Sequence, residues 1–147
     1  MSFITKQSLS NEAAQLMVEA AANQAKKLGI SVNIAVVDDG GHLVAFSRMD
    51  HAALLSIEIA QNKAYTAAAF GIPTHKWYDM IKDHDALRTG IVHTDRLVVF
   101  GGGYPIFSGE TLAGAIGVSG GSEEEDMACC QAALDSITLT NRGEKNE

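Results

Sequence analysis

Imidazole side chains are the most versatile chemical groups in this chain, and their spacing limits what they can do. The five histidines form no HxxxH, HxH or HExxH pattern, which argues against a preformed three-histidine metal centre. His51 differs from the rest, because it follows Asp50 at the predicted junction between a strand and an apolar helix. An imidazole there can ligate iron or bond a carboxylate, and a purely structural role is the alternative. His51 is therefore our candidate metal ligand.

A single cation interrupts the apolar helix predicted over residues 52–70. Lys63 either extends its ammonium to solvent over a buried stem or binds the carboxylate of a ligand. In the second case, Tyr65 and Phe70 supply aromatic surface for stacking against that ligand. We therefore take Lys63 and Phe70 as candidate binding residues.

The most unusual segment is a glycine run that leads into a predicted strand: Gly101, Gly102, Gly103, Tyr104 and Pro105. It lacks the lysine and the strand-to-helix setting that a phosphate-binding loop needs. One interpretation is close backbone packing around a turn. The other is a pocket wall where the backbone approaches a flat ligand, since glycine permits such contact without a steric penalty. These five residues are the remaining binding candidates.

The two cysteines, Cys129 and Cys130, are neighbours on a predicted helix. Adjacent helical side chains point about 100° apart and rarely form a disulfide, which predicts reduced thiols and a cytoplasmic protein. A nucleophile or a thiolate ligand to iron is one interpretation. Cys130 lies on an apolar stripe of the helix, however, and this favours buried packing.

Composition bounds the class of protein. The 147 residues are about one domain's worth, so we expect a single domain over residues 1–147. Acidic residues number 18 and basic residues 11, giving a net charge of −7 that opposes binding to nucleic acid. No apolar stretch approaches the roughly 20 residues of a membrane span, and the N-terminus does not resemble a signal peptide.

Turn and capping residues divide the chain into helices and strands. A first helix is capped by Ser8 or Ser10 and ends at Gly29, and a last helix starts at a capping box formed by Ser122 and Glu125. Between them we expect two hairpins, a long helix, two short helical pieces and a further strand. The hairpins pair residues 31–38 with 42–48 and residues 104–108 with 111–119. The long helix spans residues 52–70, the two short helical pieces lie within 74–87, and the further strand spans 97–100.

This order of elements predicts an α+β domain of profilin-like or PAS-like outline, with three layers. Its centre is an antiparallel sheet of about five strands flanked by helices. The helix over 52–70 is apolar nearly all round, so a second layer or another subunit must cover it. Its small face invites close packing of a second helix or sheet and favours a homo-oligomer. The alternative is that the first and last helices of the same chain cover it. The residues of this face are Ala53, Ile57, Ala60, Ala64, Ala67 and Ala68.

Five segments together resemble one known family, and they follow one another in the family's order. Residues 33–43 correspond to its motif A-V-V-D-x-G-G-x-L, residues 47–50 to R-M-D and residues 60–67 to K-A-x-T-A. Residues 101–106 correspond to G-G-x-P and residues 114–121 to G-A-I-G-V-S-G. The chain is thereby similar to GlcG/HbpS-like haem-binding (haem-degrading) domains. Such domains also form the C-terminal part of PduO-type corrinoid adenosyltransferases.

The resemblance implies a profilin-like fold, cytoplasmic members and even-numbered homo-oligomers from dimer to octamer. It further implies a link to glycolate, diol or glycerol metabolism and a tetrapyrrole ligand, haem. We therefore expect a cytoplasmic protein that binds haem in a pocket between subunits. His51 is then the metal ligand, Lys63 a partner of a propionate, and the 101–105 segment a pocket wall. Two alternatives stay open: an enzyme that degrades haem or acts on a small carboxylate, and a non-catalytic interaction protein of a dehydratase pathway.

Overall fold

A computed structural model describes residues 2–145, with side chains described through residue 138. Helices and strands alternate in the order expected from the turn signals. Their bounds are α1 (Asn11–Leu28), β1 (Asn33–Asp38), β2 (Leu43–Arg48), α2 (Leu55–Phe70), the 3₁₀ turn η1 (Thr74–Lys76), α3 (Trp77–Ile81), α4 (Asp85–Ile91), β3 (Gly103–Ser108), β4 (Thr111–Ser119) and α5 (Glu123–Lys145).

The sheet has four strands in the order β2-β1-β4-β3, and every neighbouring pair is antiparallel. The α+β class and the antiparallel sheet flanked by helices are thus confirmed. The fifth strand, expected over residues 97–100, is wrong: within the described residues this segment is a loop. The N–H of Val98 donates to the Thr66 hydroxyl in α2, at 3.0 Å, and so does not enter a strand ladder.

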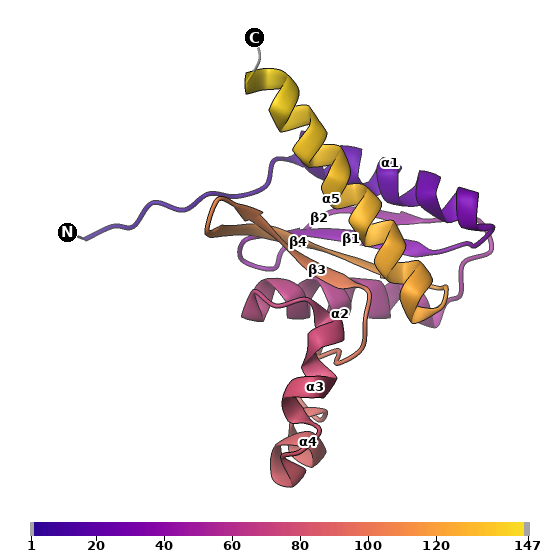
Figure 1. Cartoon of the computed structure of the whole chain (residues 1–147), viewed down its shortest axis with the longest axis vertical. Coiled ribbons are helices and arrows are strands. Elements are labelled where there is room, and N and C mark those ends of the chain that lie inside the picture. The colour runs from indigo at the N-terminus through magenta and orange to yellow at the C-terminus, as the bar shows by residue number, and fades with distance from the viewer. Residues whose placement is uncertain (1, 146–147) are drawn as a thin grey trace.

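Helices cover both faces of the sheet, so the domain has three layers (Figure 1). Alternate residues of β1 point to opposite faces, as the period of a strand requires. Ile34 and Val36 join the core formed with α1 and α5. Ala35 and Val37 join a second core formed with α2.

The small face of α2 packs on the chain's own sheet. Its residues Ala60 and Ala64 are fully buried, and a side chain at Gly117 of β4 would collide with their backbone. Small residues on both sides let the helix approach the sheet closely. The chain's own sheet therefore covers Ala60, Ala64, Ala67 and Ala68, rather than the first and last helices. The homo-oligomer expected from this face stays a prediction.

Local caps fix the ends of the outer helices as expected. Ser10 caps α1 by accepting the N–H of Ala13, and Gly29 ends that helix in the left-handed region with φ 72°. At the start of α5, Ser122 and Glu125 exchange side-chain and backbone hydrogen bonds of 2.9 and 3.2 Å. The predicted capping box is thus confirmed.

An arm formed by α3 and α4 extends from the end of α2 away from the sheet (Figure 1). No residue of α4 is buried. Among the described residues, none of the helices combines the length and the apolarity that crossing a membrane requires.

Candidate functional site

Lys63 is the most deeply buried cation of the candidate set. Its side chain lies in α2 with 1% of its surface exposed, and its Nζ donates to the Val118 carbonyl at 2.9 Å and to Asp126 Oδ2 at 3.1 Å. Burial raises the pKa of Asp126, and the Lys63 charge acts in the opposite direction. The solvent-exposed interpretation of Lys63 is wrong. Its ammonium is paired with the Asp126 carboxylate, so no ligand carboxylate is needed to balance its positive charge.

The glycine run lies against this ion pair. Gly102 adopts φ 120°, and a side chain there would meet both Lys63 Nζ and the Val118 carbonyl. Gly103 donates its N–H to the Thr74 hydroxyl at 2.9 Å. The structure therefore brings Lys63 and residues 101–103 together, through internal packing of backbone around a buried charge.

The last two residues of that segment, Tyr104 and Pro105, lie in the edge strand β3, which begins at Gly103. Tyr104 is half-buried beside His75, with ring centroids 5.4 Å apart, and Pro105 is buried. Burial raises the pKa of Tyr104. Pro105 is compatible with the sheet because β3 is an edge strand and needs fewer backbone donors.

His51 lies at the opposite end of α2 from Phe70. It precedes the helix and Phe70 ends it, so about 22 Å of helix separates them. His51 has φ 69°, and only one other non-glycine residue, Arg96, has a positive φ in the described part of the chain. Such a backbone is strained for a residue with a side chain and occurs often at functional sites. His51 and Phe70 therefore belong to different places on the surface.

His51 borders an open hollow of about 450 Å³ between α1 and the end of β2. Lys26 of α1 and Arg48 of β2 line the same hollow, as do Ala22 and Met49. The Arg48 guanidinium is fixed by two hydrogen bonds to the Ala52 carbonyl, at 3.0 and 3.3 Å. The hollow thus combines one exposed imidazole, two cations, the carboxylate of Asp50 and a small apolar surface.

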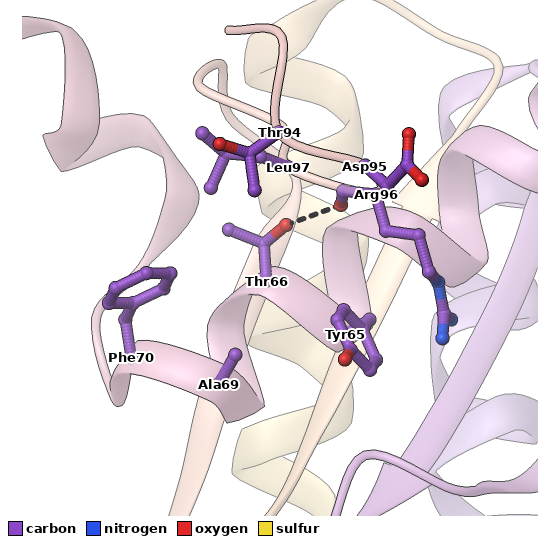
Figure 2. A pocket seen from close by; sticks show the side chains of 8 residues that line it. All are labelled: Tyr65, Thr66, Ala69, Phe70, Thr94, Asp95, Arg96 and Leu97. Atoms are coloured by element: carbon purple, nitrogen blue, oxygen red, sulfur yellow. Dashed lines mark hydrogen bonds between the residues drawn. The ribbon is translucent and has the colours of Figure 1, made fainter. Parts of the chain in front are cut away.

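Phe70 lines a second cavity, of about 220 Å³, between the end of α2 and the 94–97 loop. Figure 2 shows this loop lying across α2, with Phe70 at one end of the cavity and Tyr65 near the Arg96 side chain at the other. The loop is held by Thr66, whose hydroxyl donates to the Arg96 carbonyl at 2.8 Å. Arg96 could not be predicted from the sequence, because no residue pattern marks an arginine with a left-handed backbone.

A histidine–carboxylate pair occupies the turn of the first hairpin. His42 Nδ1 lies 3.1 Å from Asp38 Oδ1, and the His42 side chain is exposed. Burial acts to raise the pKa of Asp38, but hydrogen bonds from His42 and from the Gly40 backbone outweigh it and lower that pKa. The sequence shows that His42 follows Asp38 by four residues. Their contact, however, depends on the conformation of the hairpin turn between them.

Both thiols are buried, which confirms the packing interpretation. Cys129 and Cys130 are free and have no exposed surface. Burial raises the pKa of Cys129 to about 11 and also raises that of Cys130. A protonated, inaccessible thiol is a poor nucleophile and a poor metal ligand. No group of three or more His, Cys, Asp or Glu residues among those described is arranged to hold a metal ion.

A comparison with protein families finds a match that spans most of the chain. The family described as "Haem degrading protein HbpS-like" matches residues 9–135. The chain belongs to the HbpS-like family. The expected resemblance is thereby confirmed, and the matched range runs from the residue before the α1 cap into α5.

Relatives of this HbpS-like chain fall into two groups by length. A 15.0 kDa protein in the dhaT–dhaS intergenic region of Citrobacter freundii is 37% identical over 127 residues, which are 86% of this chain and 89% of that protein. The corrinoid adenosyltransferase PduO of Salmonella typhimurium is 36% identical over 84% of this chain. That match spans only 37% of PduO.

Two solved structures share the fold of this HbpS-like chain. The Klebsiella pneumoniae protein ORFY superimposes with a TM-score of 0.88 at 33% identity, over 94% of this chain and 96% of that one. The PduOC protein of a PduOC–haem complex superimposes with a TM-score of 0.80 at 33% identity, over 88% and 95% of the two chains.

Proposed function

We propose that this protein binds haem or a related tetrapyrrole in the hollow beside His51. The observation that carries the proposal is His51 itself: an exposed imidazole on a left-handed backbone, at the border of a hollow with two cations. Membership of the HbpS-like family and the fold shared with the haem-bound PduOC protein support it. We take residues 1–147 as one cytoplasmic domain of profilin-like type.

The donor chemistry of the hollow fits such a ligand. A neutral imidazole is a good iron ligand, and Lys26 and Arg48 offer two positive charges for the two propionates. The Asp50 carboxylate at the same border opposes them, so the net charge of the lining is +1 with a neutral imidazole. The volume of about 450 Å³ is within the usual range of about 300–1,000 Å³ for ligand sites. When bound, haem would supply redox and oxygen chemistry at its iron. The chain's own residues orient the ring and neutralise its carboxylates.

Other residues expected at the ligand take other roles in this proposal. Lys63 and residues 101–105 stabilise the packing between α2, β3 and α5, because their contacts are internal. Phe70 lies too far from His51 to contact the same ring, since the length of α2 separates them. His51 is retained as the metal ligand, and Lys26 and Arg48 replace Lys63 as partners of the propionates.

The hollow is open, so a second copy of the chain is proposed to cover the other face of the ring. Ligand sites normally bury most of the ligand surface, and Ala22 and Met49 provide little apolar area on one chain. A two-fold dimer or a larger even-numbered oligomer would close the site, since closed symmetry is the usual form of self-association. Light scattering with and without added haemin tests this.

Titration with haemin tests the proposed ligand. The wild-type protein should develop a Soret band, and His51→Ala should shift or abolish it because the imidazole ligand is lost. His93→Ala is the matched control, since His93 is also exposed but lies outside the hollow. Equal spectra and affinities for the wild type and the His51 variant would remove His51 from the site. Failure of the wild type to take up haemin would refute the function.

A second candidate function, breakdown of the bound haem, is supported by the family's description as haem degrading. Oxygen and a reductant such as ascorbate should then bleach the Soret band and release iron faster than in haemin without protein. A stable band under these conditions would leave a binding protein accessory to glycolate, diol or glycerol metabolism. Similarity to GlcG and to PduO supports that setting.

A further inference from the structure

The arm formed by α3 and α4 is poorly supported by the rest of the chain. Residues 82–90 are all exposed, and no residue of α4 is buried. Figure 1 shows the arm extending beyond α2, on the side of the molecule opposite to α1 and α5. A helix of seven residues is marginal in water, because isolated helices shorter than about 12–15 residues are not stable. The helix α4 therefore needs packing that the described part of the chain does not supply.

Apolar side chains are exposed along the same arm. Between 43% and 55% of their surface is accessible in Tyr78, Met80, Leu87 and Val92. Apolar residues scattered singly over a surface are ordinary, whereas a group of them on one protrusion marks a surface that contacts another molecule. A protein partner fits this arm, because its apolar residues are interspersed with charged ones and line none of the hollows described above.

The charges of the arm favour a second copy of the chain as that partner. Asp79 pairs with Lys82 at 3.3 Å, and Asp85 pairs with Arg88 at 3.4 Å, both at the exposed surface. Along the chain these charges alternate negative, positive, negative, positive at equal spacing. Reading the arm backwards inverts every sign, so two arms laid antiparallel place each of these charges opposite one of the other sign. An unrelated protein would need its own matching series, whereas a second copy already carries it.

We propose that two copies of this chain pair through their arms, antiparallel, about a two-fold axis at the turn between residues 83 and 84. The helices place the axis there: Asp79 is the centre of α3, Arg88 is the centre of α4, and both are equally far along the chain from that turn. The helix α3 of one protomer then lies against α4 of its partner, and every contact occurs twice. The opposed residues are Asp79 and the partner's Arg88, Lys82 and the partner's Asp85, Asp83 and the partner's His84, and Met80 and the partner's Leu87.

In this pairing the apolar side chains supply affinity and the charges determine the register. Neutralising one exposed charge has little effect, because solvent screens it. Reversing one charge has a larger effect, since it places like charges opposite each other at both symmetry-related contacts. The contact is separate from the hollow beside His51, because no residue of the arm lines that hollow.

Two charge reversals test the pairing, measured by sedimentation velocity without haemin. The wild type should self-associate at micromolar concentration. Asp79→Lys and Arg88→Glu should each raise the dissociation constant of the arm contact by at least about tenfold, through the like charges that they create. Both positions are exposed, so circular dichroism should show folded variants. Glu19→Lys is the matched control, because it reverses an exposed charge on α1, outside the arm, and should leave association unchanged.

Mixing the two variants identifies the partner of the arm. In a mixed pair the introduced lysine faces the introduced glutamate, and the unchanged Asp79 and Arg88 face each other, so equimolar mixing should restore wild-type association. A monomeric wild type, a variant that associates like the wild type, or a mixture that fails to recover would each overturn the proposal. Association that requires haemin and persists in both variants belongs to the hollow beside His51, so the two contacts are tested separately.

Discussion

Breaking the buried ion pair between Lys63 and Asp126 should destabilise the protein far more than breaking a surface pair. Both side chains are nearly inaccessible, at 2% and 4% exposure, and Nζ lies 3.1 Å from Oδ2. Asp126→Asn removes the countercharge and leaves one carbonyl oxygen where the carboxylate accepts from both Lys63 and Gly121. Loss of one partner of a buried pair costs about 3–5 kcal/mol, because the remaining charge stays desolvated. We expect that loss in the free energy of unfolding.

The chain contains its own control for this prediction. Asp79 and Lys82 form a surface pair 3.3 Å apart, with 79% and 45% of their side chains exposed. Asp79→Asn should cost about 0–1 kcal/mol, since solvent screens such a pair. In thermal unfolding, the Asp126 variant should then melt roughly 6–20 °C lower, at about 2–4 °C per kcal/mol for a domain of this size.

A double-variant cycle tests whether the effect is the ion pair itself. Lys63→Met with Asp126→Asn should be about 1–3 kcal/mol less destabilised than the sum of the single variants, because no charge is then left buried alone. Urea unfolding followed by circular dichroism gives these energies at one fixed protein concentration. Equal effects of the Asp126 and Asp79 variants, or strictly additive single variants, would refute the reasoning.

Four further predictions concern caps, packing and the access of reagents to the thiols. Ser122→Ala should cost about 1 kcal/mol in urea unfolding through loss of the α5 cap, and leave haemin uptake unchanged. Gly117→Ala should abolish or severely destabilise folding, because its side chain would collide with the backbone of α2. Gly90→Ala should stabilise the protein by about 0.5–1 kcal/mol, since that helical position is open. Cys129 and Cys130 should resist iodoacetamide at pH 8 in the native protein and react after unfolding, as mass spectrometry would show; rapid native labelling would contradict their burial.

Local signals in the sequence predicted most of the fold. The cap at Ser10, the turn at Gly29 and the box of Ser122 with Glu125 each depend on residues within four positions of one another. Such interactions are the same in any fold, so the sequence is sufficient to predict them. The two hairpins follow for the same reason, because their turns are short and rich in glycine.

The strand predicted over residues 97–100 shows where local pattern fails. Leu-Val-Val-Phe has a high preference for strands. One of its backbone N–H groups, however, donates to a side chain of α2 and not to a neighbouring strand. The Thr66 hydroxyl accepts the Val98 N–H and donates to the Arg96 carbonyl, so the segment crosses α2 as a loop. Two hydrogen bonds of Thr66 thus hold the segment as a loop over α2, where Leu97 lines the cavity beside Phe70.

Lys63 shows the same limit for the candidate site. Its countercharge, Asp126, is 63 residues further along the chain, and nothing in either segment marks them as partners. A lysine in an apolar helix is therefore equally compatible with solvent, with a ligand or with a buried pair until the layers are known. The fold decides among these by bringing the start of α5 next to the middle of α2.

The close packing of α2 on the sheet determines where ligands can bind. Because alanines face β1 and β4 and glycine lies opposite them, no space for a ligand remains between helix and sheet. The larger side chains Tyr65 and Phe70 must then lie on the outer side, where a loop can cross them and enclose a small cavity. The hollow at His51 lies beyond the other end of the helix. Among residues 2–145, the two non-glycine residues with a left-handed backbone, His51 and Arg96, occur where the chain leaves its regular elements and borders an open space.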